Sequence, residues 1–296
     1  MSTRIAFKRV LVGFQQSAPD RAAVRLAAEL AGLLRVDLCC MCIEDPGLSG
    51  LAAYPGRREF RVLGRHWSPL DSDQLSREID LHARAVRRLF DEAARRAGVQ
   101  GRFETVRAAV GEALRSLPTS GDIVIISEPQ SPSERVLAPF PQLVRAAFQS
   151  KATVFYIPRR IVRRSGPVVA VATSRDDASI AVATAVAASA GESVVVLEVT
   201  DGADGAPAAP RGEGAGVSAG EVPTGRLRVA RRALSDIASL SAALRGLDER
   251  MVVLGRSVFR ADDVAMPSAF AALRGVPVLL VGEPAGGEGS EADEAA

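Results

Sequence analysis

Short hydrophobic runs alternate along this chain with longer segments whose apolar residues recur at helical spacing. The runs at 10–12 and 168–171 are continuously apolar, as in parallel strands that helices cover on both faces. An alanine-rich segment with an amphipathic helical pattern follows each run. Alternation of this kind predicts an α/β doubly wound architecture with right-handed crossovers.

The first part of the chain aligns without gaps on a later part, so that Ser17 falls on Ser174 and Asp20 on Asp177, an offset of 157 positions. An internal repeat predicts a duplicated domain. We therefore expect two flavodoxin-like or Rossmann-like, doubly wound, parallel five-stranded sheets in tandem. Further matched segments are 102–107 with 225–231, 122–127 with 250–257, and 153–157 with 276–281.

The two predicted domains are unequal. We expect domain 1 at 1–160, a linker at 161–166 and domain 2 at 167–284. Domain 1 carries a loop from Pro46 to Leu70 and a helix at 72–97 that Gly98 ends. Domain 2 has a stretch rich in Gly, Ala and Pro at 201–224 instead, which predicts a flexible insert and the loss of one helix. The acidic tail at 285–296 is expected to be disordered.

Composition excludes several classes of protein. Hydrophobic residues make up 47% of the 296 residues and charged residues 24%, as in ordinary folded proteins. The net charge is only +2, and the densest basic cluster, Arg159, Arg160, Arg163 and Arg164, is expected to be a solvated linker, which argues against nucleic acid as a partner. No apolar run suits a spanning helix or a signal peptide, so we expect no membrane partner and a cytoplasmic location. The preference for arginine over lysine suggests a bacterial source with a GC-rich genome.

Together the two halves resemble the universal stress protein family in a tandem form. The resemblance implies five-stranded parallel sheets in the flavodoxin-like order that associate through their last strands, and it implies either an ATP-binding or a non-binding branch. The segments that carry the resemblance are 10–17, 38–45, 122–127 and 153–158 in the first half, and 169–174, 194–200, 251–257 and 275–281 in the second.

In the ATP-binding branch, an Asp ends the first strand, and a glycine-rich loop after the fourth strand cradles phosphates through backbone N–H groups. Here the Asp positions hold Gln15 and Ala172. The first-half loop, 127–134, has no glycine, and its prolines lack N–H donors while its glutamates repel phosphate. Pro139 and Pro141 stand where the family's last Gly-Ser would lie. We expect no ATP at this half.

The second half departs less from the family pattern. Gly255 retains the opening glycine of the loop, but 259–263 lacks the second glycine and adds two carboxylates. Arg256 could contact a phosphate, although ordinary structure at the end of a sheet is the competing interpretation. The candidate cofactor-binding residues are Thr173, Ser174, Gly255, Arg256 and Ser257.

Other chemistry-bearing residues favour structural roles. Cys39, Cys40 and Cys42 fit neither a zinc nor a redox spacing, and we expect them to pack in a core strand. His66 and His82 are too few for a metal site. The aromatic loop around Trp67 is either a lid, a partner surface or a satellite cluster that packs on the second helix. We expect neither catalytic residues nor a bound metal.

The sequence thus favours a non-enzymatic protein with a regulatory or protective role in stress, acting through an unknown protein partner or a small molecule and needing no cofactor. Its two domains would pair within one chain, and a further homo-oligomer is left open. The alternative is an adenine-nucleotide (ATP or AMP) binding protein with its site in domain 2. A third hypothesis, an enzyme of the adenine-nucleotide hydrolase-like group, is disfavoured because no polar catalytic cluster is visible.

Overall fold

The computed structural model describes most of the chain, and the account below concerns those residues alone. They are 7–14, 21–44, 46–47, 50, 54, 56–61, 64–129, 140–200, 224–230, 236–260 and 262–282.

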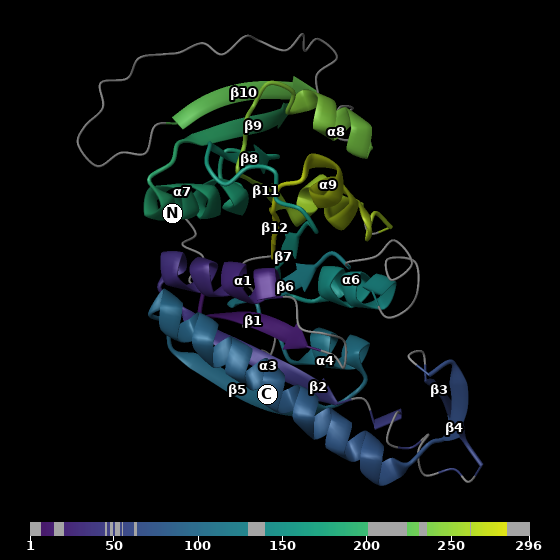
Figure 1. The fold of residues 1–296 in the computed structure, drawn as a ribbon. Coiled ribbons are helices and arrows are strands. Elements are labelled where there is room, and N and C mark those ends of the chain that lie inside the picture. Colours follow the sequence, from purple (N-terminus) through teal and green to yellow (C-terminus); the bar gives the residue numbers. More distant parts are fainter. Residues whose placement is uncertain are drawn as a thin grey trace, which may run out of the picture.

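Ten strands form one continuous sheet, in the order β10-β9-β8-β11-β12-β7-β6-β1-β2-β5 (Figure 1). The first half contributes β1 (Arg9–Phe14), β2 (Asp37–Glu44), β5 (Gly101–Arg107), β6 (Asp122–Ser127) and β7 (Thr153–Ile157). The second half contributes β8 (Val168–Ala172), β9 (Val194–Thr200), β10 (Thr224–Ala230), β11 (Met251–Gly255) and β12 (Val278–Val281).

Each half of the sheet has the same strand order. Counted within its half, the order is 3-2-1-4-5 in both cases, and all pairings inside a half are parallel. The predicted α/β doubly wound class is therefore confirmed. Within that class the order is the Rossmann one and not the flavodoxin order 2-1-3-4-5 that the resemblance implied.

The two halves join through their last strands. β7 and β12 pair antiparallel, with Phe155 opposite Leu279 at the centre of the register. This pairing, which we call the seam, is close-packed at one end, because a Cβ on Gly282 would lie only 2.5 Å from the carbonyl oxygen of Lys151. The sequence predicted two sheets, and the pairing of β7 with β12 joins them into one.

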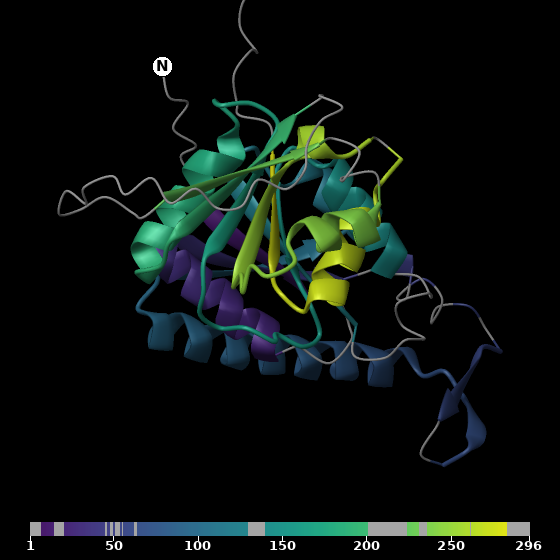
Figure 2. The same ribbon diagram turned by 90° about the horizontal axis from the view of Figure 1, so that it is seen from above.

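Helices cover both faces of the sheet (Figures 1 and 2). One face carries α1 (Arg21–Leu34), α3 (Ser72–Ala97) and α7 (Ala178–Ala190), whose apolar residues share one core cluster. The other face carries α4 (Val110–Ser116), α6 (Phe140–Gln149), α8 (Ile237–Ala243) and α9 (Met266–Arg274) over a second cluster. Helix α3 spans the predicted 72–97 and ends at Gly98 as expected.

The repeat is offset by 158 positions in the strands and not by 157. Val10 pairs with Ile123 as Val168 pairs with Met251, and Val10 and Val168 both face α1 and α7. An offset of 157 would place each side chain on the opposite face, because side chains alternate along a strand. By strand register, Ala172 is therefore the counterpart of Phe14, the last residue of β1, and it is a fully buried strand residue.

The segment expected to be a loop at 46–70 contains a β-hairpin, formed by β3 (Arg58–Arg61) and β4 (His66–Pro69). The sequence pattern missed it because neither strand has a buried face: Phe60 is 48% exposed and Trp67 58%. Thr224, assigned to the flexible insert, begins β10. The rest of that insert and the predicted tail lie outside the described residues, so the lost helix stays a prediction.

A buried carboxylate ties the linker to the second half. Glu249 has no exposed surface, and its two oxygens accept hydrogen bonds from Arg274, both at 2.9 Å. Arg163 lies 3.9 Å from the same carboxylate and 3.3 Å from Asp248. The sequence suggested that the linker arginines are all solvated. This is wrong for Arg163, which forms ion pairs with Asp248 and Glu249 of the second half.

We expect Glu249→Gln to lower the free energy of unfolding by about 3 kcal/mol, because it leaves the charge of Arg274 poorly paired in a buried site. Chemical denaturation measures the change. The matched control is Glu92→Gln, which removes an exposed ion pair with Arg96 within α3 and should cost less than about 1 kcal/mol. Equal effects would contradict the role assigned to Glu249.

Candidate site at the sheet edge

The candidate residues lie where β8 and β11 end side by side. They are strands 1 and 4 in the order 3-2-1-4-5, and the connections that follow them run to opposite faces of the sheet. Helix α7 follows β8 on one face, and α9 follows β11 on the other. Open α/β sheets bind ligands at such a crevice, outside the carboxyl ends of the strands.

Asp177 is the centre of this site. One carboxylate oxygen accepts hydrogen bonds from the backbone N–H of Thr173 at 2.9 Å and from its hydroxyl at 3.1 Å. The other oxygen accepts the backbone N–H of Ser179 at 2.9 Å, so Asp177 also caps helix α7. The carboxylate thus uses donors that the strand end and the helix N-terminus offer to an anion.

Gly255 allows the carboxylate to lie against β11. A Cβ at this position would be 3.0 Å from Oδ1 of Asp177, closer than ordinary side-chain contacts permit. Ser257 lies beside them, with its hydroxyl 3.1 Å from that of Thr173. Thr173, Gly255 and Ser257 are therefore brought together as predicted, whereas Ser174 is an exposed turn residue. The retained glycine is explained by the carboxylate that packs on it.

Arg256 turns away from this crevice. Its guanidinium donates to the backbone carbonyl of Phe148, in the last turn of α6 in the other half, and, at 2.6 Å, to that of Ala152, just after this helix. It also lies over the ring of Phe148. A cation is favourable at a helix C-terminus, where carbonyl groups lack helical partners. In this structure Arg256 links the two halves and does not point at a phosphate position.

The loop after β11 closes on itself. It begins with a short helix, η2 (Arg256–Val258), and the carboxylate of Asp263 accepts the backbone N–H of Arg260 at 3.0 Å. In the first half, residues 15–20 and 130–139 lie outside the described part, so Gln15, Ser17 and most of the proline-rich loop cannot be compared. Glu128 is described, and its carboxylate accepts the backbone N–H of Arg159 at 3.0 Å.

The structure also places the cysteines and the aromatic residues that the sequence singled out. All three cysteines are buried in β2, and Cys39 and Cys40 belong to the cores on opposite faces of the sheet, as expected of core residues. Phe60 and Trp67 pack together on the hairpin, with ring centroids 5.3 Å apart. Among the described residues, no three His, Cys, Asp or Glu side chains are grouped so as to hold a metal ion.

Sequence reasoning missed the central role of Asp177, which it assigned only as a helix cap. A signal was present, because Asp177 follows Thr173 by four positions across a tight turn and can reach back to the strand end.

No helix in the described part of the chain has the length and apolar character needed to cross a membrane.

Comparison with known proteins identifies the fold. No protein-family model and no curated protein matches the sequence. A universal stress protein from Archaeoglobus fulgidus is similar in structure, with a TM-score of 0.61 at 13% identity over 94% of this chain and 99% of that one. A putative universal stress protein from Pseudomonas aeruginosa UCBPP-PA14 gives 0.52 at 15% identity, over 94% of each chain. A functionally unknown protein from Pseudomonas aeruginosa PAO1 also gives 0.52 at 15%, over 95% and 94%. The chain therefore has the universal stress protein fold along nearly its whole length.

Asp177→Ala should lower the free energy of unfolding by about 1–2 kcal/mol, because α7 loses its N-cap and Thr173 loses an acceptor. Thermal or chemical denaturation measures the loss. Asp176→Ala is the matched control: this neighbouring aspartate is exposed, and we expect a change within about 0.5 kcal/mol. A similar loss in both variants would remove Asp177 from the centre of the site.

The cysteines should resist alkylation in the native protein. Burial raises the pKa of the Cys39, Cys40 and Cys42 thiols, so the reactive thiolate is scarce at neutral pH and becomes populated only as pH rises well into the alkaline range. Mass spectrometry after iodoacetamide treatment should find all 3 cysteines unmodified without denaturant and modified in guanidinium chloride. Rapid native labelling would mean that β2 opens readily.

Proposed function

We propose that this protein has a regulatory or protective role, as a non-enzymatic protein related to the universal stress proteins that binds a protein or a small molecule. The proposal includes the tandem arrangement, with one domain in each half. It also includes the absence of ATP binding in the manner of the family's binding branch. The likeness in fold is an analogy and supplies no ligand by itself.

The observation that carries the proposal is the internal carboxylate at the second sheet edge. Asp177 accepts the N–H groups of Thr173 and Ser179, which are the donors a phosphate would need there. Its negative charge repels a triphosphate at the same position. Arg256, the cation that could offset that charge, is engaged by the carbonyls of Phe148 and Ala152.

The alternative is adenine-nucleotide binding at Thr173, Ser174, Gly255, Arg256 and Ser257. Its support is the juxtaposition of two hydroxyl-bearing residues, Thr173 and Ser257, with Gly255 at the carboxyl edge of parallel strands. For this alternative to hold, a nucleotide would have to displace the Asp177 carboxylate from its donors.

We expect isothermal titration calorimetry with ATP to give no binding in the micromolar range, and we expect no adenine nucleotide in small molecules extracted from the purified protein. Micromolar affinity would overturn the proposal in favour of the alternative if Gly255→Val abolished it and Gln15→Ala did not. Gly255→Val tests the second edge because a side chain there collides with Asp177. Gln15→Ala is its control in the first half.

A further inference from the structure

A groove lies between the two halves, on the face of the sheet that carries α1 and α7. One wall is α1, and the other is the chain segment that leaves β7 and leads into the second half. The groove has a volume of about 410 Å³, within the range of small-molecule sites. We call it the inter-half groove, and its principal lining residues are Arg25, Leu26, Leu33, Arg160, Arg164 and Arg250.

The charge of the inter-half groove is strongly unbalanced. Six arginines line it against a single carboxylate, that of Glu29. Two of the six are paired, Arg163 with Asp248 and Arg250 with Glu192. The remaining four form no ion pair with any residue in the described ranges: Arg25, Arg159, Arg160 and Arg164.

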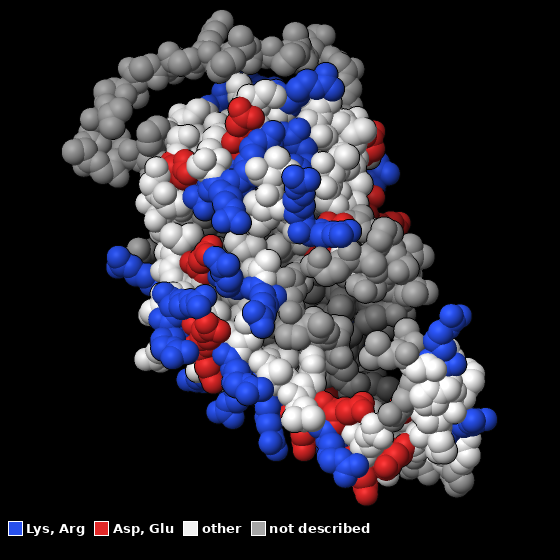
Figure 3. Space-filling view, in the orientation of Figure 1, with Lys and Arg blue, Asp and Glu red and all other residues white. Residues whose placement is uncertain are grey.

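These four arginines come from two separate elements that face each other across the groove. Arg25 lies on α1, and the other three lie on the segment after β7. Guanidinium groups present several N–H donors in one plane and bind phosphate or carboxylate oxygens in pairs. In Figure 3, basic side chains outnumber the acidic ones among which they lie along the face that carries α1, α3 and α7.

The rest of the lining is apolar. Leu26 and Leu33 of α1 are half-buried, and the lining also includes Phe155 of β7, Met251 of β11 and Pro277, which precedes β12. Cationic rims over an apolar floor favour a molecule that has an anionic head and an apolar body. A fully hydrated inorganic ion would leave that floor uncovered.

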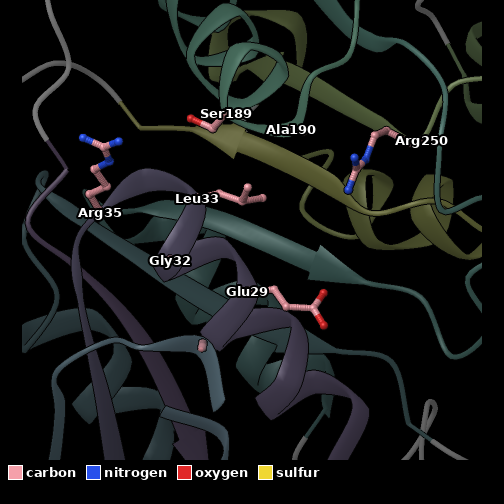
Figure 4. Close-up of a pocket in the computed structure, with 8 residues that line it drawn as sticks. Glu29, Gly32, Leu33, Arg35, Ser189, Ala190 and Arg250 are labelled. Atoms are coloured by element: carbon pink, nitrogen blue, oxygen red, sulfur yellow. The ribbon is translucent and has the colours of Figure 1, made fainter. Parts of the chain in front are cut away.

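An adjoining hollow of about 630 Å³ continues the groove towards the end of α7 and shares Glu29, Leu33 and Arg250 with it. Figure 4 shows Leu33 on α1, facing the end of α7 where Ser189 and Ala190 lie, with Arg35 and Arg250 on opposite sides. A ligand longer than the first part of the groove therefore has further space and a further cation, Arg35.

We infer that the inter-half groove binds a small amphiphilic anion, whose phosphate or carboxylate group is held by the arginines and whose apolar body covers the leucines. The inference deepens the proposed binding role, on which it rests, by naming a ligand class and a site. It uses none of the sheet-edge residues around Asp177, so ATP binding at that edge and anion binding in the groove are tested separately.

The test titrates the purified full-length protein with 8-anilinonaphthalene-1-sulfonate, an anion with an apolar body whose fluorescence rises on binding, and then displaces it. Octyl phosphate and octanoate should displace the probe, and neutral octyl glucoside should not. The more potent of the two anions identifies the head group, and equal potency means that any oxyanion is accepted. Binding should weaken as salt is added.

Arg160→Gln with Arg164→Gln should weaken octyl anion binding by at least about tenfold, since each loses a charge-assisted hydrogen bond. Arg25→Gln, on the other wall, should weaken it independently. The matched control is Arg84→Gln with Arg88→Gln, which removes the same charge from the exposed surface of α3. Circular dichroism verifies that each variant is folded.

Three results would overturn the inference. The first is equal affinity in the groove variants and in the α3 control. The second is displacement by octyl glucoside as efficient as by the anions. The third is arginine-dependent displacement by a duplex oligonucleotide but by neither octyl anion, which would mark a nucleic-acid surface. ATP binding that Gly255→Val abolishes, with octyl anion binding intact, would instead contradict the proposed function alone.

Discussion

The architecture depends on the antiparallel pairing of β7 with β12. Each half of the sheet would otherwise end in an apolar strand with unpaired backbone groups, and such edges invite association with other chains. The pairing covers both edges at once, with Val154, Phe155, Leu279 and Leu280 almost completely buried. Arg256 strengthens the seam by donating to carbonyl groups at the C-terminal end of α6 and just after it in the opposite half.

With the seam closed, β5 and β10 are the edge strands of the large sheet within the described part of the chain. Both carry charged residues at exposed positions, among them Glu104 and Arg107 on β5 and Arg226 and Arg228 on β10. Charged side chains discourage further strand addition. The second half also completes the inter-half groove, since Arg250, Met251 and Pro277 line it together with α1 and the segment after β7.

Much of the fold could be predicted because a strand covered on both faces leaves a continuous apolar run, as at Val168–Ala172. The long helix α3 was predicted for a similar local reason, its apolar stripe and its terminal Gly98. The hairpin β3–β4 was missed because solvent surrounds both strands. The direction of Arg256 could not be read from the sequence either, since it depends on how the second half meets α6. The sequence placed Thr173, Gly255 and Ser257 at one edge of the sheet, but their carboxylate partner Asp177 was recognised only once the turn was seen in three dimensions.

The seam relates the halves by an approximate two-fold axis, since Phe155 and Leu279, which face each other, occupy equivalent positions in the two repeats. A dimer of identical chains would have to repeat every side chain on both sides of such an axis. A single chain does not have this requirement. The counterpart of Arg256 in the first half is Glu128, a residue of opposite charge. Arg256 binds backbone carbonyl groups of the other half, whereas Glu128 binds the backbone of its own half. Covalent connection also keeps the halves together on dilution, at an effective concentration that two separate chains would lack. The carboxyl ends of the strands face opposite directions in the two halves, because β7 and β12 pair antiparallel. The two halves can therefore differ in sequence at these ends while the seam still holds them together.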